Sequence, residues 1–128
     1  MESKSPIPLD KGGSFSFDRR FHVEIFRGGM NRLLLRSRRT ESEGRIEVMF
    51  QYVLRMDIPM GFEGLTIEEM PQEELKKDSW VDLLVELPEG KLFLLFSGAN
   101  IVGRVFAAAC GFGEDDEPDP AQSMFFMM

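Results

Sequence analysis

The residue types that most often carry out catalysis are scarce in this chain, which has one histidine, His22, and one cysteine, Cys110. Histidine is the commonest general acid or base, but His22 falls on the polar side of a predicted strand, with no nucleophile motif beside it. Cys110 follows three alanines, whereas an activated thiolate needs cationic neighbours or a helix N-terminus. These positions favour a rim histidine and a buried structural thiol.

Carboxylates are abundant, and adjacent acids form two pairs, Glu68 with Glu69 and Glu73 with Glu74. Acid–base catalysis by two carboxylates needs one of them in an apolar pocket, so that their pKa values separate. Adjacent acids followed by lysines are typical of a solvated face instead. Residues 114–119 hold five acids in six positions but lack the alternation and central glycine of a calcium loop. We therefore expect no enzyme, no metal site and no cofactor.

Phosphate and nucleic-acid binding are also disfavoured. The glycine pairs at 12–13 and 28–29 are not followed by the Lys-Ser or Lys-Thr of a phosphate-binding loop. Arginines within residues 36–39 could bind the phosphates of a single-stranded nucleic acid. However, the chain has 22 Asp or Glu against 15 Lys or Arg, and the resulting net charge of −7 repels a polyanion. Such an acidic protein is better suited to a basic protein partner.

Charge is distributed unevenly along the 128 residues. Residues 1–60 carry 11 Lys or Arg against 8 Asp or Glu, a balance of +3, whereas residues 61–128 carry 4 against 14, a balance of −10. Opposite patches could attract a second copy of the chain or a charged partner. Basic and acidic strands lying side by side in one sheet would give the same pattern.

The elements that must position these residues are mainly strands. Alternating apolar residues predict three antiparallel strands at 21–27, 33–38 and 45–54. A shorter strand is expected at 65–70, followed by a short helix or turn that starts at Pro71.

Residues 80–87 fit either helical spacing or strand alternation. The turn residues at 87–91 and the apolar run at 92–96 favour two strands joined as a hairpin. A last strand is expected at 101–110. The fold class is therefore mainly β, with an antiparallel sheet forming a sandwich or partial barrel and at most one or two short helices.

The expected organisation is one β-rich domain, residues 15–112, between an extended N-terminal arm, residues 1–14, and an acidic linker with an apolar tail, residues 113–128. The tail ends Met124-Phe125-Phe126-Met127-Met128. Burying one such side chain is worth about 1.5–3 kcal/mol, so we expect the tail to dock on its own domain or on a second copy.

The first residues lack the basic and apolar regions of a secretory signal, and no apolar run approaches the roughly 18 residues that span a bilayer. We expect a cytoplasmic protein with no membrane contact.

Together these features favour a non-catalytic protein-interaction module that self-associates, for example as a homodimer. The contact candidates are Glu68, Glu69, Glu73, Glu74, Met124, Phe125 and Phe126. A second possibility is a small β-barrel carrier of an apolar ligand, with His22 or Tyr52 at its mouth.

The segment from Phe21 to Arg38, the Phe-x-x-Val at 50–53 and Gly64-Leu65-Thr66-Ile67 resemble the small β-rich immunity proteins that neutralise bacterial polymorphic toxins. The resemblance covers about half of the chain. It implies an acidic surface that blocks a basic toxin face, with Glu68, Glu69, Glu73, Glu74 and the acidic tail as contacts.

Overall fold

The computed structural model describes residues 7–8, 13–27, 31–38 and 44–115. This part of the chain forms nine antiparallel strands, one α-helix and one 3-10 helix, which confirms the predicted fold class. The bounds are β1 Ile7–Pro8, β2 Ser14–Arg27, β3 Arg32–Ser37, β4 Arg45–Gln51, β5 Arg55–Asp57, β6 Gly61–Glu69, α1 Gln72–Leu75, the 3-10 helix Val81–Leu84, β7 Lys91–Ser97, β8 Asn100–Ala107 and β9 Ala109–Asp115.

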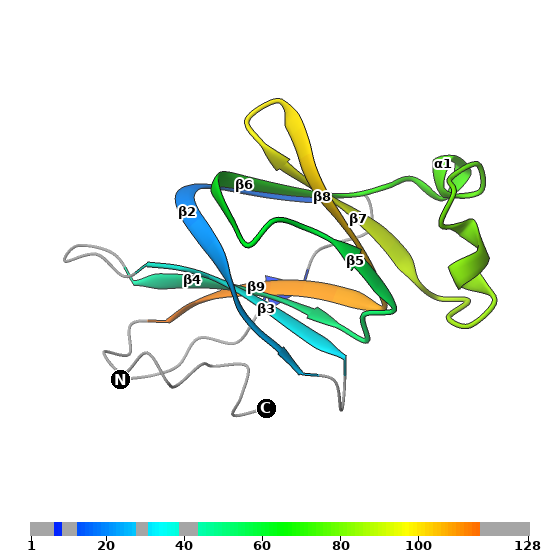
Figure 1. Cartoon of the computed structure of the whole chain (residues 1–128), viewed down its shortest axis with the longest axis horizontal. Coiled ribbons are helices and arrows are strands. Elements are labelled where there is room, and N and C mark those ends of the chain that lie inside the picture. Colours follow the sequence, from blue (N-terminus) through cyan, green and yellow to red (C-terminus); the bar gives the residue numbers. More distant parts are fainter. Residues whose placement is uncertain (1–6, 9–12, 28–30, 39–43, 116–128) are drawn as a thin grey trace.

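The strand ladders, together with one direct chain connection, form a closed circuit. Starting from β2, successive ladders join β2 to β3, β3 to β4 and β4 to β9. A single residue, Ala108, separates β9 from β8, and further ladders then lead from β8 through β7 and β6 back to β2. The result is a flattened barrel of two layers, with β3, β4 and β9 in one and β6, β7 and β8 in the other (Figure 1).

Two bent regions let the chain pass between the layers. The first is in the long strand β2, whose early part pairs with β6 and whose later part pairs with β3, with register shifts at 17–20 and 23–25. The second is a corner where β4 runs into β5 and β8 runs into β9. Tyr52 adopts a positive φ of 58° there. Backbone hydrogen bonds from Leu54 N to Phe106 O, 2.9 Å, and from Ala108 N to Gln51 O, 3.0 Å, continue the ladder round the corner.

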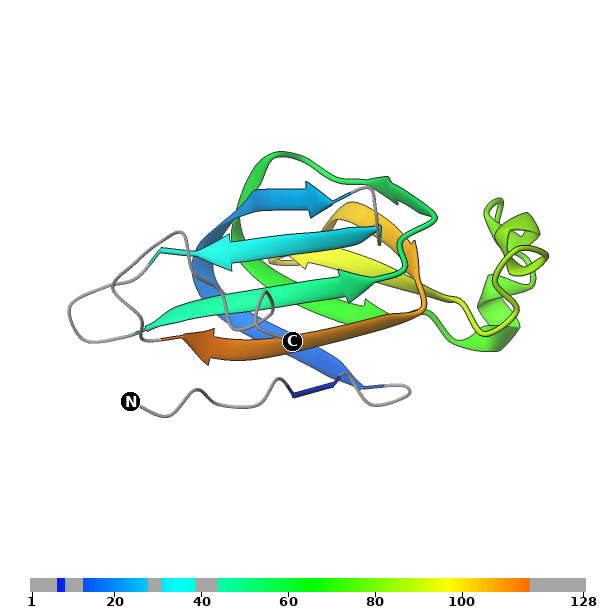
Figure 2. The ribbon, with the colours of Figure 1, turned by 90° about the horizontal axis from the view of Figure 1, so that it is seen from below.

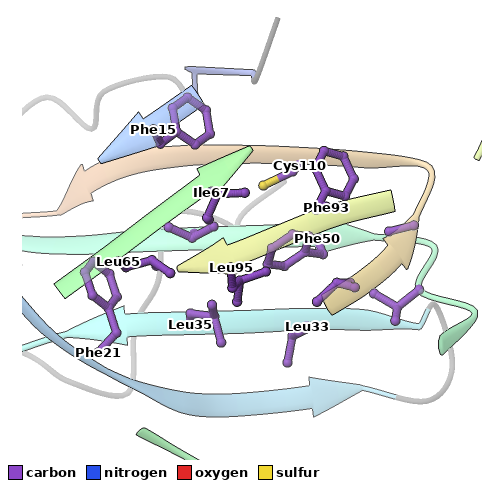
Figure 3. Packing of buried hydrophobic residues seen from close by; sticks show 14 of the residues in the cluster. Phe15, Phe21, Leu33, Leu35, Phe50, Leu65, Ile67, Phe93, Leu95 and Cys110 are labelled. Atoms are coloured by element: carbon purple, nitrogen blue, oxygen red, sulfur yellow. The ribbon is translucent and has the colours of Figure 1, made fainter. Parts of the chain in front are cut away.

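The core lies between the two layers and is rich in phenylalanine (Figure 3). Phe50 meets Phe93 from the opposite layer edge-on, with ring centroids 5.5 Å apart. Phe112 of β9 packs edge-on against Phe15 and Phe17 of β2, at 4.1 Å and 5.1 Å. Edge-to-face packing of this kind adds about 0.5–1.5 kcal/mol per pair beyond the area buried.

The strand predictions at 21–27, 33–38 and 65–70 are confirmed, but the strand expected at 45–54 ends at Gln51. Its alternation continues through Tyr52 in the sequence, although the positive φ of Tyr52 turns the backbone. The strand expected at 80–87 is wrong: residues 81–84 form a 3-10 helix, so the helical spacing of that segment was the correct signal.

The observed strands extend past the expected domain limits, because β2 starts at Ser14 and β9 reaches Asp115. The strand β1 pairs with β9, so part of the expected arm, Ile7–Pro8, belongs to the sheet. The apolar tail, Met124 to Met128, lies outside the described residues. Neither helix in the described ranges has the length and apolar character needed to cross a bilayer.

Candidate functional site

The connection between β6 and β7 is far longer than the strand geometry requires. These strands are direct antiparallel neighbours, with Glu69 opposite Phe93, and such strands are usually joined by about two to five residues. Residues 70–90 connect them instead, and they contain α1 and the 3-10 helix. This segment extends beyond the ends of the strands (Figures 1 and 2). Because it is also rich in Asp and Glu, we call it the acidic projection.

The acidic projection is anchored by a second, smaller apolar cluster. Leu75, Trp80 and Leu87 from the projection are buried against the outer side chains of β7 and β8, Leu92 and Phe106. Gly90 makes this close approach possible, since a Cβ atom at this position would lie 2.5 Å from the ring of Phe106. The projection is therefore a packed part of the domain rather than a loose loop.

Two arginines hold Trp80 in place. The guanidinium carbon of Arg104 lies 4.2 Å from the centroid of the indole, and that of Arg55 lies 4.6 Å from it. Asp78 joins the two parts, because its Oδ1 accepts hydrogen bonds from the Trp80 backbone N–H, at 2.9 Å, and from Arg104 Nη1, at 3.3 Å. Cation–π contacts contribute about 0.5–1 kcal/mol when exposed and about 2 kcal/mol when desolvated, and Trp80 is buried.

The outer surface of the acidic projection is strongly negative. The segment contains six Asp or Glu and two Lys, a balance of −4. Asp78 is paired with Arg104, and the other five acids are exposed: Glu73, Glu74, Asp82, Glu86 and Glu89. Val85, whose residue is 84% exposed, lies among them. Exposed acids around an apolar side chain can steer and then contact a basic protein surface.

The structure brings together some of the residues predicted as contacts. Glu73 and Glu74 lie on α1, and Glu68 is exposed on the adjoining strand β6. Glu69 is buried, with its Oε1 atom 3.8 Å from Nζ of Lys91, and it offers a partner little surface. Met124, Phe125 and Phe126 lie outside the described residues.

Sequence reasoning missed Asp82, Glu86, Glu89 and Val85 as contacts. The strand expected at 80–87 places Val85 on the face opposite Asp82 and Glu86, and Glu89 falls in the turn expected at 87–91. The available signal was the helical spacing of Trp80, Leu83, Leu84 and Leu87, which places apolar residues on one side and leaves the acids on the other.

The lone histidine takes part in an ionic network on the outer side of β2 and β3. His22 Nε2 lies 2.7 Å from Glu24 Oε2, and the other oxygen of Glu24 accepts a hydrogen bond from Arg36 Nη1 at 3.2 Å. Because Phe21 points into the core, His22 points away from it. Tyr52 is exposed at the corner after β4. Neither residue faces the interior of the barrel.

The lone thiol lies within the core. Cys110 is buried beside Phe50, its partner across the ladder, and this burial raises the pKa of the thiol well above its usual value. A raised pKa keeps the sulfur protonated, and the protonated thiol is a poor nucleophile. Within the described ranges, no cluster of three or more His, Cys, Asp or Glu could hold a metal ion.

Comparisons with protein-family models, curated proteins and solved structures found no match to this chain.

Replacing Trp80 by alanine should release the acidic projection. The variant loses the packing of the indole and both cation–π contacts, and we expect the free energy of unfolding to fall by about 3–5 kcal/mol. Hydrogen exchange followed by mass spectrometry should show lost protection in residues 70–90. Val85→Ala is the matched control and should leave the exchange unchanged. Equal protection of residues 70–90 in Trp80→Ala and the parent would contradict the assigned anchor.

Cys110 should resist alkylation in the folded protein. Raising the solution from about pH 7 to about pH 9 accelerates alkylation of an ordinary thiol, whose pKa is near 8.5, but should barely change the rate at Cys110. The same chain in urea should react rapidly. Mass spectrometry after timed iodoacetamide treatment measures both rates, and a native rate that rises with pH like that of a free thiol would refute the buried position.

Proposed function

We propose that this chain is a non-catalytic, cytoplasmic protein-interaction module that presents its acidic projection to a basic surface on another protein. The observation that carries the proposal is the insertion of residues 70–90 between two strands that a short turn could join. Connections between neighbouring antiparallel strands are usually short, and binding residues are disproportionately carried on connecting segments that a rigid scaffold positions.

The construction of the projection supports this role. Three of its apolar residues, Leu75, Trp80 and Leu87, anchor it, and five of its six acids face solvent. A rigid anchor reduces the conformational entropy that is lost when a partner binds. Negative charge on the projection favours rapid encounter with a basic partner, and exposed Val85 supplies an apolar contact.

The positions of the chemistry-bearing residues support binding over catalysis or ligand transport. His22 is engaged with Glu24, and the thiol of Cys110 is desolvated. The aromatic rings of the core pack against one another across the two layers, where a carrier would need space for its ligand. Retention of a small molecule in native mass spectrometry of the purified protein would favour the carrier.

A basic toxin face is one partner of the proposed chemistry, in keeping with the resemblance to immunity proteins. Glu68, Glu73, Glu74, Asp82 and Glu86 would form the contact. Self-association through the same surface would require a basic patch on the second copy, just as binding to another protein requires a basic surface on that protein.

Charge reversal on the projection tests the proposal. We expect Asp82→Lys/Glu86→Lys to abolish capture of a basic protein from extracts of the cells that naturally produce this chain, because each change replaces attraction by repulsion. The matched control is Asp18→Lys/Glu63→Lys, which makes the same change of charge at exposed positions on β2 and β6. Quantitative mass spectrometry of material captured by the three baits is the measurement.

The expected outcome is a basic protein, or a second copy of the chain, that the parent and the control retain and the projection variant loses. The capture should weaken as salt is raised, because the contact is ionic. An identical set of proteins on all three baits would exclude the projection as the contact surface.

A further inference from the structure

The outer face of the β3–β4–β9 layer carries side chains that are buried although they point away from the core. Leu33 and Leu35 face the core, so Leu34 and Arg36 face the opposite side of the same strand. On β4, Val48 is in the core and its neighbours Glu47 and Met49 face outward. The outward residues are nevertheless excluded from solvent, with exposures of 2% for Leu34, 3% for Arg36, 0% for Glu47 and 1% for Met49.

These residues form two rows across the layer. The strand register sets Leu34 opposite Met49 and Met49 opposite Gly111, which makes an apolar row. The same register sets Arg36 opposite Glu47 and Glu47 opposite Gly113, which makes an ionic row. Arg36 donates from Nε and Nη2 to Glu47 Oε2, at 3.1 Å and 3.0 Å. Because the two glycines have no side chains, a further segment of chain can approach the backbone of β9 closely from the outside.

No described element covers this face. Figure 2 shows β3, β4 and β9 from the outside, with every other described element behind the layer, at its edges or beyond its end. The acidic projection packs on β7 and β8 in the opposite layer. On an open sheet face, an ion pair such as Arg36–Glu47 would be in contact with water. Its burial therefore requires a covering segment of chain.

We propose that the C-terminal segment of this chain, residues 116–128, covers the outer face of its own β3–β4–β9 layer, with Phe125 and Phe126 against the apolar row. Among the stretches outside the described residues, only this segment contains several consecutive large apolar side chains. It continues directly from β9, which is one strand of the covered layer.

Reach and charge agree with this placement. Residue 111 lies four positions before the end of β9, and nine further residues lead from there to Met124. Nine residues extend to about 30 Å, more than twice the roughly 13 Å that four strand residues cover, so the tail can turn back to Leu34 and Met49. The last residue of β9, Asp115, lies opposite Arg45, and the sequence that follows it contains three further acids at 116–119. An acidic linker is therefore steered toward basic residues of the same layer.

Methionine methyl NMR tests the proposal with internal controls. In the full-length chain labelled at methionine methyl groups, a soluble gadolinium chelate broadens exposed methyls. The reporters are Met49 on the outer face, half-buried Met70 in the second apolar cluster and Met60, whose residue is 75% exposed. We expect Phe125→Ser/Phe126→Ser to bring the broadening of Met49 close to that of Met60 and to leave Met70 unchanged. The matched control, Gln122→Ala/Ser123→Ala, should keep Met49 protected.

Equal protection of Met49 in both variants would overturn the proposal. Protection of the parent that disappears on dilution, together with a fall in mass from dimer to monomer, would also overturn it, because the cover would then be a second copy. If the serine variant fails to fold, a nitroxide on Gln122→Cys replaces it. It should broaden Met49 but not Met70, and dilution into unlabelled chains should leave the effect unchanged. An unaffected Met49 would contradict the placement.

Discussion

The constraint on which the other features depend is the corner where β4 turns into β5 while β8 turns into β9. Two strands must bend at the same place and remain hydrogen-bonded, which here requires the positive φ of Tyr52 and the hydrogen bonds of Leu54 and Ala108. Without this corner, the pairings would form an open sheet with two unprotected edges. With it, the sheet closes on itself and encloses a single aromatic core.

Closure also gives the molecule two outer faces that differ in what they carry. The face of β7 and β8 receives Trp80 and anchors the acidic projection, because Arg104 of β8 and Arg55 of β5 reach the indole from neighbouring strands. The face of β3, β4 and β9 carries the buried apolar and ionic rows, for which we propose the C-terminal segment as cover. The two proposals thus place interaction with a partner and cover of the sheet on opposite layers.

Much of the fold could be predicted from alternation, but neither the corner nor the candidate site could. The strands at 21–27 and 33–38 have a simple period of two, which the structure keeps. The alternation through Tyr52 looks like one continuous strand, and nothing local in the sequence marks a left-handed residue there. Trp80 satisfied two periodicities at once, and its partners Arg55 and Arg104 are distant in sequence. Contacts of this kind become visible only after the strands are paired.

The most direct measurement of the central claim is amide hydrogen exchange at the corner. If the barrel is closed, the amides of Leu54 and Ala108 are locked in the ladder and should exchange as slowly as those of the core strands β3 and β4. Exchange at both amides as fast as in the exposed β7–β8 turn at Gly98 would mean that the circuit of strands is open. The division of the surface into two outer faces would then be wrong.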